Sequence, residues 1–578
     1  MKEKIMIAMR SKLLFAVALN MLIAGLCIWI TAFSYADSSD YYNSLFICRD
    51  HFYYSSTINY ILAVIVGTIQ YAVTDVNAFV MVEILLSYAA FTSITFVFAD
   101  KFNFRKAFVF SMVMNILFAL NHYSEIDSFK TSALLLASGF LLILNAIRNK
   151  RYSLPCWIGV LEVLFGTFYC YVYFFVALGF ALAFFLGDMM AKKKYRLEFQ
   201  KFFWYFRPFM LMFILVTLLA LGGNQFSYSV NHATENSTGY YEYDSLTQAI
   251  DTLPFPSYNE HMEEFAEVGI TDECEYALLK SNYYDADKML TTDSLHLVHD
   301  IQLDESEKTV FYALGDVFGD IWGHITNFDA FAVSGLVYLL ISIVFIIYHK
   351  NRFSFFPLFY IITAVIASSV IRYLFDGADH NTYGNWVLMI LLLLYSFNFE
   401  GERSKKNSSK LRMSNGYMII SCGVLVALFC TFTAVYVLNH PDKENDAPWS
   451  LITEINRNPE CYYVMDTDSK KDFDRYTENY IHPLWGFRHG YLENLDSFGY
   501  IHNTDMLHKR NLPDNIYEAL LSNHKIYVID KNITFKKEKY FNLNYSESYE
   551  NIFYSLEKEL NDFKIYEVVV TRIGNAGE

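Results

Sequence analysis

A polar segment that follows the first long apolar run concentrates residues suited to acid–base or phosphate chemistry. It carries Asp37, Asp40, Arg49, Asp50 and His51 within fifteen residues. Two carboxylates at the mouth of a membrane helix can act as a general base or hold a divalent cation. The arginine and the histidine could bind phosphate oxygens, a geometry that suits the guanidinium fork. The alternative is ordinary surface polarity, because Asp and Ser are common where a helix ends.

A second polar segment lies between two late apolar runs. Arg372 stands at the edge of the first run, close to Asp376, Asp379 and His380. A short polar loop between apolar helices could line a cavity and bind phosphate. Arg372 could equally extend its side chain to the membrane interface without any binding role.

Other candidates are weaker. Glu83 and Glu162 lie inside apolar runs, where an ionisable side chain is costly and suggests function. Each could also reach the headgroups or sit protonated and hydrogen-bonded, so neither is placed in the candidate site. Trp485, Tyr491 and Tyr500 could stack on sugar rings or form the core of a small domain.

The composition indicates that membrane helices position these residues. Of 578 residues, 54% are hydrophobic and 18% are charged, less than the roughly 25% charged residues of a soluble domain. We expect a polytopic α-helical membrane protein with about eleven spans. The first apolar run could be a signal peptide, but its length and the lack of a clear cleavage site favour an uncleaved helix. The predicted spans are 13–33, 78–98, 107–121, 133–147, 154–170, 172–190, 208–222, 330–348, 355–373, 386–399 and 417–438.

Basic clusters between the spans set the expected topology. They include Lys101 with Arg105, Arg148 with Arg151, and the stretch from Arg403 to Arg412. All of them face the cytoplasm, as the positive-inside rule requires, only if the apolar run 57–73 does not cross the membrane. We therefore expect this run to lie on the outer face. The alternative is a true short span with the later topology inverted.

Four regions follow from this topology. A transmembrane core, 1–222, contains the outer loop 34–77. An acidic extracytoplasmic region, 223–329, is followed by further transmembrane helices, 330–439, and by a soluble segment, 440–578. Residues 224–329 hold 21 acidic residues against three lysines, which argues against nucleic acid as a partner. In the last segment, strand-like runs at 461–466, 525–530 and 563–571, with helical stretches predicted at 515–522 and 549–560, indicate a small extracytoplasmic α/β domain.

This order of elements resembles the GT-C class of integral-membrane glycosyltransferases, especially members from bacterial polysaccharide and cell-envelope loci. The resemblance rests on the first outer loop, where ADSSDYYNS occupies the place of the family's acidic motif, and on the run QYAVTDVNAFVMVEILLSY before the second helix. The adjacent acid pair of many members is absent, and Asp37 and Asp40 are three residues apart. Asp40 is favoured as the catalytic carboxylate because Tyr41 and Tyr42 follow it; Asp37 is the second choice.

The resemblance implies an inverting hexosyl transfer at the outer face of a bacterial plasma membrane. The donor would be a sugar on polyprenyl phosphate, and the acceptor a glycan or a lipid-linked glycan. Asp40 would activate the acceptor hydroxyl, while Arg49, His51, Arg372 or His380 would bind the donor phosphate. A Mg²⁺ or Mn²⁺ ion, if one is used, would be held by Asp37 and Asp40.

Two other functions remain open from the sequence. An O-antigen-type polymerase or ligase would also have about a dozen spans and one large outer loop, although such enzymes usually lack a folded C-terminal domain. A non-enzymatic flippase or transporter would be expected to show repeat symmetry or broken helices. Neither feature is evident in the sequence.

Overall fold

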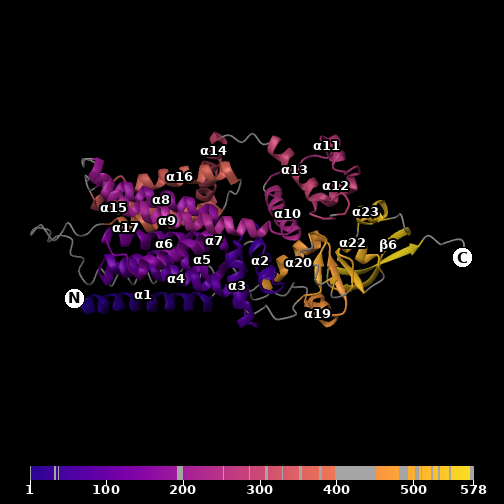
Figure 1. Ribbon diagram of the computed structural model, residues 1–578, viewed down its shortest axis with the longest axis horizontal. Coiled ribbons are helices and arrows are strands. Elements are labelled where there is room, and N and C mark those ends of the chain that lie inside the picture. The colour runs from indigo at the N-terminus through magenta and orange to yellow at the C-terminus, as the bar shows by residue number, and fades with distance from the viewer. Residues whose placement is uncertain are drawn as a thin grey trace, which may run out of the picture. The chain divides into compact units, whose positions relative to one another are not determined.

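The structure is a computed structural model, and helices dominate it (Figure 1). It describes residues 2–30, 34–36, 38–191, 199–251, 253–285, 287–305, 310–327, 330–349, 354–375, 380–397, 449–480, 484, 492–500, 507–508, 511–522, 525–531, 534–545, 549–560 and 562–572. By its internal contacts the chain divides into two compact units. Unit 1 comprises Met1–Ala36, Val80–Phe226 and Lys308–Asp442, and unit 2 comprises Asp37–Phe79, Ser227–Glu307 and Lys443–Glu578.

Unit 1 is a bundle of mainly apolar helices. They are α1 (Lys2–Ile30), α4 (Ala78–Lys101), α5 (Phe104–Ser124), α6 (Ser128–Asn149), α7 (Leu154–Tyr169), α8 (Tyr171–Ala191), α9 (Phe199–Asn231), α14 (Val310–Asn327), α15 (Ala330–Tyr348), α16 (Phe356–Phe375) and α17 (His380–Ser396). Seven helices in the described part of the chain are long and apolar enough to cross a membrane, which supports a membrane protein. Ten predicted spans coincide with described helices, but α7, α15 and α17 are shorter, so the total of about eleven stays a prediction. The predicted span 417–438 lies outside the described residues.

Helix α6 forms the centre of this bundle and is buried along most of its length. It approaches α7 closely because glycines face one another. A Cβ atom on Gly139 would lie 2.6 Å from the carbonyl oxygen of Gly159, and one on Gly159 would lie 2.8 Å from that of Gly139. Small residues of this kind allow helix backbones to pack tightly in membranes.

Polar contacts join several helix ends on one side of the bundle. Lys12 Nζ of α1 lies 2.7 Å from Asp100 Oδ1, near the end of α4. Asn145 of α6 donates to Asp100 at 3.1 Å and accepts from Tyr395 of α17 at 3.1 Å. Helices α1 and α4 therefore run antiparallel, with Lys12 and Asp100 at the same end.

Unit 2 contains a five-stranded sheet of order β4-β3-β5-β7-β6. Strands β4 (Leu495–Ser497), β3 (Tyr462–Met465) and β5 (Ile526–Asp530) are parallel, and β7 (Phe563–Arg572) runs antiparallel to both β5 and β6 (Tyr549–Leu560). Its other elements are α2 (Ser38–Cys48), α3 (Tyr60–Ala72), α10 (Glu235–Asp251), α11 (Met262–Glu267), α12 (Glu273–Lys280), α13 (Thr292–Glu305), α19 (Trp449–Arg457), α20 (Thr467–Tyr480), α22 (Ile516–Leu520) and α23 (Phe535–Tyr545).

The two faces of the sheet bury different sets of side chains. Tyr462 and Val464 join a core with apolar residues of α10–α13, whereas Tyr463 and Met465 join a second core with α19. The alternation follows the two-residue period of a strand. The acidic segment is therefore folded onto the sheet through its apolar side chains.

One secondary-structure prediction is wrong. The stretch predicted as a helix at 549–560 is strand β6, which pairs with β7 in a long antiparallel hairpin. Ile552 is buried in the core, and Tyr554 lies opposite Val568. Pairing with a valine-rich strand outweighs the helical pattern of the isolated segment, because strand preference depends strongly on tertiary context.

Candidate functional site

Helix α2 carries Asp40 in its first turn, where the helix dipole favours a carboxylate. Its carboxyl group is buried, with only 2% of the residue exposed. The two tyrosines that follow fix α2 against α20 within unit 2: the Tyr41 hydroxyl lies 3.1 Å from Thr477 Oγ1, and the Tyr42 hydroxyl donates to Asp474. Asp37 lies outside the described residues.

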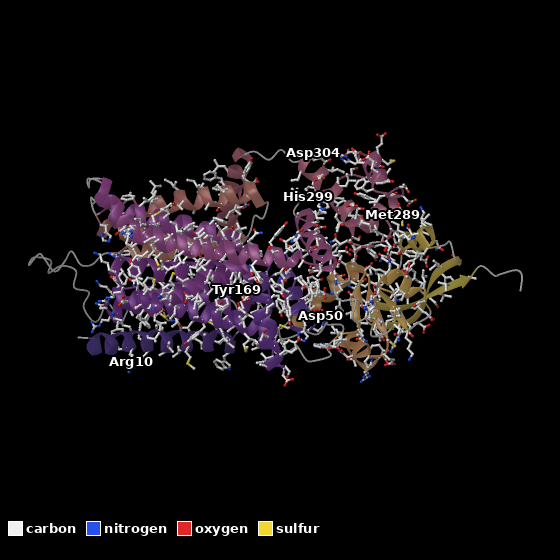
Figure 2. The ribbon with its side chains drawn as sticks, viewed as in Figure 1. Arg10, Asp50, Tyr169, Met289, His299 and Asp304 are labelled. Atoms are coloured by element: carbon white, nitrogen blue, oxygen red, sulfur yellow. The ribbon has the colours of Figure 1, made fainter. Side chains whose placement is uncertain are left out.

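Arg49 has protein partners for its guanidinium group. Its Nε and Nη2 atoms donate to the two carboxylate oxygens of Asp50 at 2.7 and 2.8 Å, and Nη1 donates to the Leu492 carbonyl at 3.2 Å (Asp50 is labelled in Figure 2). Burial opposes the charged form, but Asp50 outweighs it and the pKa of Arg49 is raised. These contacts tie the end of α2 to the C-terminal segment, and a phosphate contact by Arg49 stays a prediction.

The remaining predicted phosphate ligands lie apart from this arginine. His51 is exposed and stacks on Tyr71, with ring centroids 4.4 Å apart. Arg372 lies in unit 1, where its guanidinium pairs with Asp320 of α14. His380 begins α17, and its side chain is outside the described part. The structure thus places the predicted site residues in two units and brings Asp40, Arg49 and His51 into one of them.

Unit 1 contains a second group of charged residues, which we call the carboxylate centre: Glu83, Glu125, Asp127 and Lys130. Glu83 Oε1 accepts hydrogen bonds from the backbone N–H of Asp127 at 2.8 Å and from the Thr131 hydroxyl at 2.9 Å. Lys130 Nζ lies 2.7 Å from Glu125 Oε2 and 3.3 Å from Asp127 Oδ2. Asp127 also caps α6 by accepting from the Lys130 N–H. Two carboxylates thus pair with one ammonium group, and the third, Glu83, is hydrogen-bonded to the backbone of Asp127.

Buried polar atoms without a described hydrogen-bond partner accompany this centre. Among the described residues they include Glu83 Oε2, Asn121 Oδ1, His122 Nε2 and Tyr383 Oη. The rings of His122 and Tyr383 are 5.5 Å apart, and Lys130 Nζ lies 5.9 Å from the Tyr383 ring centroid. Unsatisfied polar atoms are rare in folded interiors, so this set has unused capacity to bind a polar ligand.

A short parallel pairing connects this centre with the start of the loop 34–77. Strand β1 (Ser34–Tyr35) pairs with β2 (Glu125–Ile126), with Ser34 opposite Glu125. The Ala36 N–H then donates to the Ile126 carbonyl at 3.0 Å. Ala36 immediately precedes Asp37 in the chain. The loop 34–77 therefore begins at strand β1, and the strand paired with it, β2, carries Glu125 of the carboxylate centre.

Glu162 has a different environment. Its two oxygens accept from the Ser93 hydroxyl at 2.5 Å and the Ser138 hydroxyl at 2.7 Å. These serines belong to α4 and α6, so the carboxyl group connects three helices. Both oxygens are satisfied within the bundle, which favours a structural role.

The aromatic residues of the C-terminal segment are only partly described. Trp485 and Tyr491 lie outside the described residues. Tyr500 packs among Tyr240, Tyr243 and Tyr284, and its hydroxyl donates to the Asn236 carbonyl at 3.2 Å. Tyr500 therefore contributes to packing between the acidic segment and the sheet.

One group with metal-ligand spacing occurs in the described chain: Glu260, His261 and Glu305. His261 Nε2 lies 2.8 Å from Glu305 and Nδ1 lies 3.4 Å from Glu264. Because both ring nitrogens already face carboxylates, the contacts are those of an ion-pair clamp between α11 and α13. The predicted Mg²⁺ or Mn²⁺ site at Asp37 and Asp40 stays a prediction.

Sequence reasoning singled out Glu83 but did not include Glu125, Asp127, Lys130, His122 or Tyr383. A signal was present, because the polar stretch from Asn121 to Lys130 separates two apolar runs and carries two acids and a lysine. No family model, no curated protein and no solved structure matches this chain, so the site is argued from its geometry alone.

Proposed function

We propose that this chain is a membrane glycosyltransferase that transfers a sugar from a polyprenyl-phosphate donor to a glycan or lipid-linked acceptor on the outer face of a bacterial plasma membrane. The observation that carries the proposal is the pairing of β1 with β2. It connects the beginning of the loop 34–77 to the carboxylate centre, of which Glu83 and Asp127 are buried, in a bundle of apolar helices. A lipid-linked substrate requires this combination of polar chemistry and lipid access.

The proposed reaction is an in-line displacement at the anomeric carbon. Asp40, or Asp37 in its place, accepts the proton of the acceptor hydroxyl while the oxygen of that hydroxyl forms a bond to the anomeric carbon of the sugar. The bond between the sugar and the donor phosphate breaks with inversion, and the phosphate leaves with the bonding electron pair. Arg49 or His51, which lie in the same unit as Asp40, would stabilise that negative charge. Within unit 1, Glu125 and Asp127 hold the Lys130 ammonium group in position.

The proposed topology places the N-terminus and the basic clusters in the cytoplasm. The contact between Lys12 and Asp100 supports it, because α1 and α4 then cross in opposite directions. A reporter fused after Arg105 should be active on the cytoplasmic side. An outside signal would invert the proposed arrangement of every later loop.

The catalytic proposal is tested in a deletion strain that is complemented with variants. Wild type should restore the envelope glycan, measured by mass spectrometry, and Asp40→Asn should not; if Asp37 is the base instead, Asp37→Asn should fail and Asp40→Asn should restore it. Each variant must be inserted in the membrane at the wild-type level, and Glu162→Gln serves as a matched carboxylate control. Normal glycan with both aspartates replaced would refute the assignment.

Purified protein distinguishes the competing functions. With a radiolabelled sugar on polyprenyl phosphate, a glycosyltransferase releases the lipid phosphate and labels the acceptor by one sugar. A polymerase or ligase would transfer whole oligosaccharides instead. A flippase would move the lipid across a vesicle membrane and leave its sugar–phosphate bond intact.

A further inference from the structure

Unit 1 has a groove formed by α14, α15, α16 and α17. Its volume is about 540 Å³. The walls are mainly aliphatic, with Leu339, Ile343 and Ile361 among the lining residues, and all three are exposed. Its polar lining includes Arg372, which pairs with Asp320, and Asn385, which bonds to Ser368 one helical turn before Arg372. A long apolar channel with a charged end matches an amphiphile with one polar head.

The charged end offers hydrogen-bond donors to an anion. The Arg372 side chain is 10% exposed and pairs with Asp320, which is 36% exposed. A guanidinium group has five N–H donors, so the ion pair with Asp320, its one ion-pair partner among the described residues, leaves capacity for a phosphate. Asn385 is buried, its amide donates to Ser368 at 2.6 Å, and its Oδ1 has no described partner. This oxygen could accept from a hydroxyl group on the head of a ligand.

Helix α14 indicates where the head group lies. It is not among the described helices long and apolar enough to cross a membrane, yet it exposes Phe318 and Trp322. Tryptophan is enriched at the membrane–water interface. The end of the groove beside α14, where Asp320 meets Arg372, is therefore the end suited to a headgroup.

The length of the groove fits an acyl chain. From Leu358 to Arg372 it follows fourteen residues of α16, roughly 21 Å at the helical rise. One leaflet of hydrocarbon is about 15 Å deep, half the thickness of the bilayer core. The groove thus accommodates one acyl chain together with the glycerol and phosphate above it.

We infer that this groove binds an anionic phospholipid of the surrounding leaflet, with an acyl chain along α15 and α16 and the phosphate on Arg372. Arg372 was predicted to bind a phosphate. In this assignment the phosphate belongs to a phospholipid of the membrane and not to the sugar donor. The assignment does not depend on the proposed transfer reaction. Asp320 competes with the phosphate for the guanidinium, so the ion pair opens when the lipid binds.

The chain's own apolar segment 417–438 is an alternative occupant. It contains no acidic residue. Such a helix would fill the apolar walls but would provide no anion for Arg372. Charge complementarity therefore favours the phospholipid.

Native mass spectrometry of the purified full-length protein tests the inference, with phosphatidylglycerol and uncharged diacylglycerol as probes. Arg372→Gln should lower the affinity for phosphatidylglycerol about tenfold, the loss expected for one charge-assisted hydrogen bond. Asp320→Asn should raise it about two- to fivefold, because the competitor of the phosphate is removed. A gain of affinity cannot arise from misfolding, so this variant protects the test from a trivial loss.

A steric pair of variants examines the acyl channel. Ala364 lines the groove, whereas Ile366 is exposed on the same helix and is not among its lining residues. Ala364→Phe should reduce phosphatidylglycerol binding at least fivefold, and Ile366→Phe should leave it within twofold of wild type. Equal binding of both lipids, or no change in Arg372→Gln, would overturn the inference. Displacement of phosphatidylglycerol by an equimolar polyprenyl phosphate would also overturn it. So would an Ala364→Phe variant that loses stability but keeps its lipid, because this result would indicate that the chain's own segment occupies the groove.

Discussion

Two buried carboxylates of the helix bundle, Glu83 and Glu162, have very different surroundings. Glu162 accepts one serine hydroxyl on each oxygen, so its polar capacity is satisfied by α4 and α6. Glu83 uses one oxygen for Asp127 and Thr131, and its other oxygen has no described partner. Both residues are at least 95% buried.

The comparison teaches that an acidic residue in an apolar helix is not by itself evidence of a site. What distinguishes the two is the neighbourhood. Glu83 is hydrogen-bonded to the backbone of Asp127, whose carboxylate pairs with Lys130, whereas the described partners of Glu162 are two neutral hydroxyls. Unused hydrogen-bonding capacity beside charged groups is suited to chemistry, whereas a carboxylate whose hydrogen bonds are all satisfied stabilises helix packing.

The largest expected effect is on activity. Glu83→Gln should reduce sugar transfer by at least about a hundredfold, because the amide removes a buried negative charge that acts on Lys130. Glu162→Gln should change it by less than about twofold, since both serines keep an acceptor or donor opposite them. Transfer from a labelled polyprenyl-phosphate sugar, at matched protein levels in membranes, measures both. Similar losses in the two variants would abolish the distinction.

The next effect is on stability. Lys130→Met should lower the free energy of unfolding by roughly 3 kcal/mol, because it leaves Glu125 and Asp127 without their cation. The value lies at the lower end for a buried pair, since the Glu125 side chain is 25% exposed. Thermal unfolding in detergent measures it at neutral pH. Lys130→Arg, which keeps the charge, is the control and should recover most of the loss.

The sequence predicts the membrane character of unit 1 and the three strands at the centre of the sheet, because apolar run length and local alternation report those features directly. It does not predict the carboxylate centre. Glu83 and Asp127 are 44 residues apart in the chain and meet only when α4 packs beside α6. Likewise Arg49 was expected to bind phosphate. It donates to the adjacent Asp50 and also to the Leu492 carbonyl, which is 443 residues away and could not be foreseen. The hairpin of β6 and β7 shows the same limit. The segment 549–560 has a helical sequence pattern, but it forms a strand because it pairs with β7.

A smaller effect tests whether Glu162 stabilises the fold through its hydrogen bonds to Ser93 and Ser138. Glu162→Ala should cost about 1–3 kcal/mol, because it leaves the Ser93 and Ser138 hydroxyls without their acceptor. The lower end is expected, since Ser138 also has the Leu135 carbonyl at 3.0 Å. Combining Glu162→Ala with Ser93→Ala and Ser138→Ala should recover part of the loss. Thermal unfolding of the single and the combined variants measures this recovery, and its absence would mean that the serines are not what the carboxyl group satisfies.

The smallest effect tests whether the same reasoning holds outside the bundle, at the exposed carboxylates around His261. The hydrogen bond that His261 donates to Glu305, opposed by partial burial and aided by Glu264, raises the pKa of His261 above its usual value. The clamp therefore stabilises unit 2 fully below the ordinary histidine pKa of about 6.5, and this contribution is lost as the pH rises through the higher folded-state pKa. Since the pair is largely solvated, we expect roughly 0.2–1 kcal/mol. Unfolding of the full chain followed between pH 5.5 and 8.5, for wild type and Glu305→Gln, should show a slope with pH that is smaller in the variant. Equal slopes would mean that this carboxylate, unlike those beside Lys130, does not hold its cation.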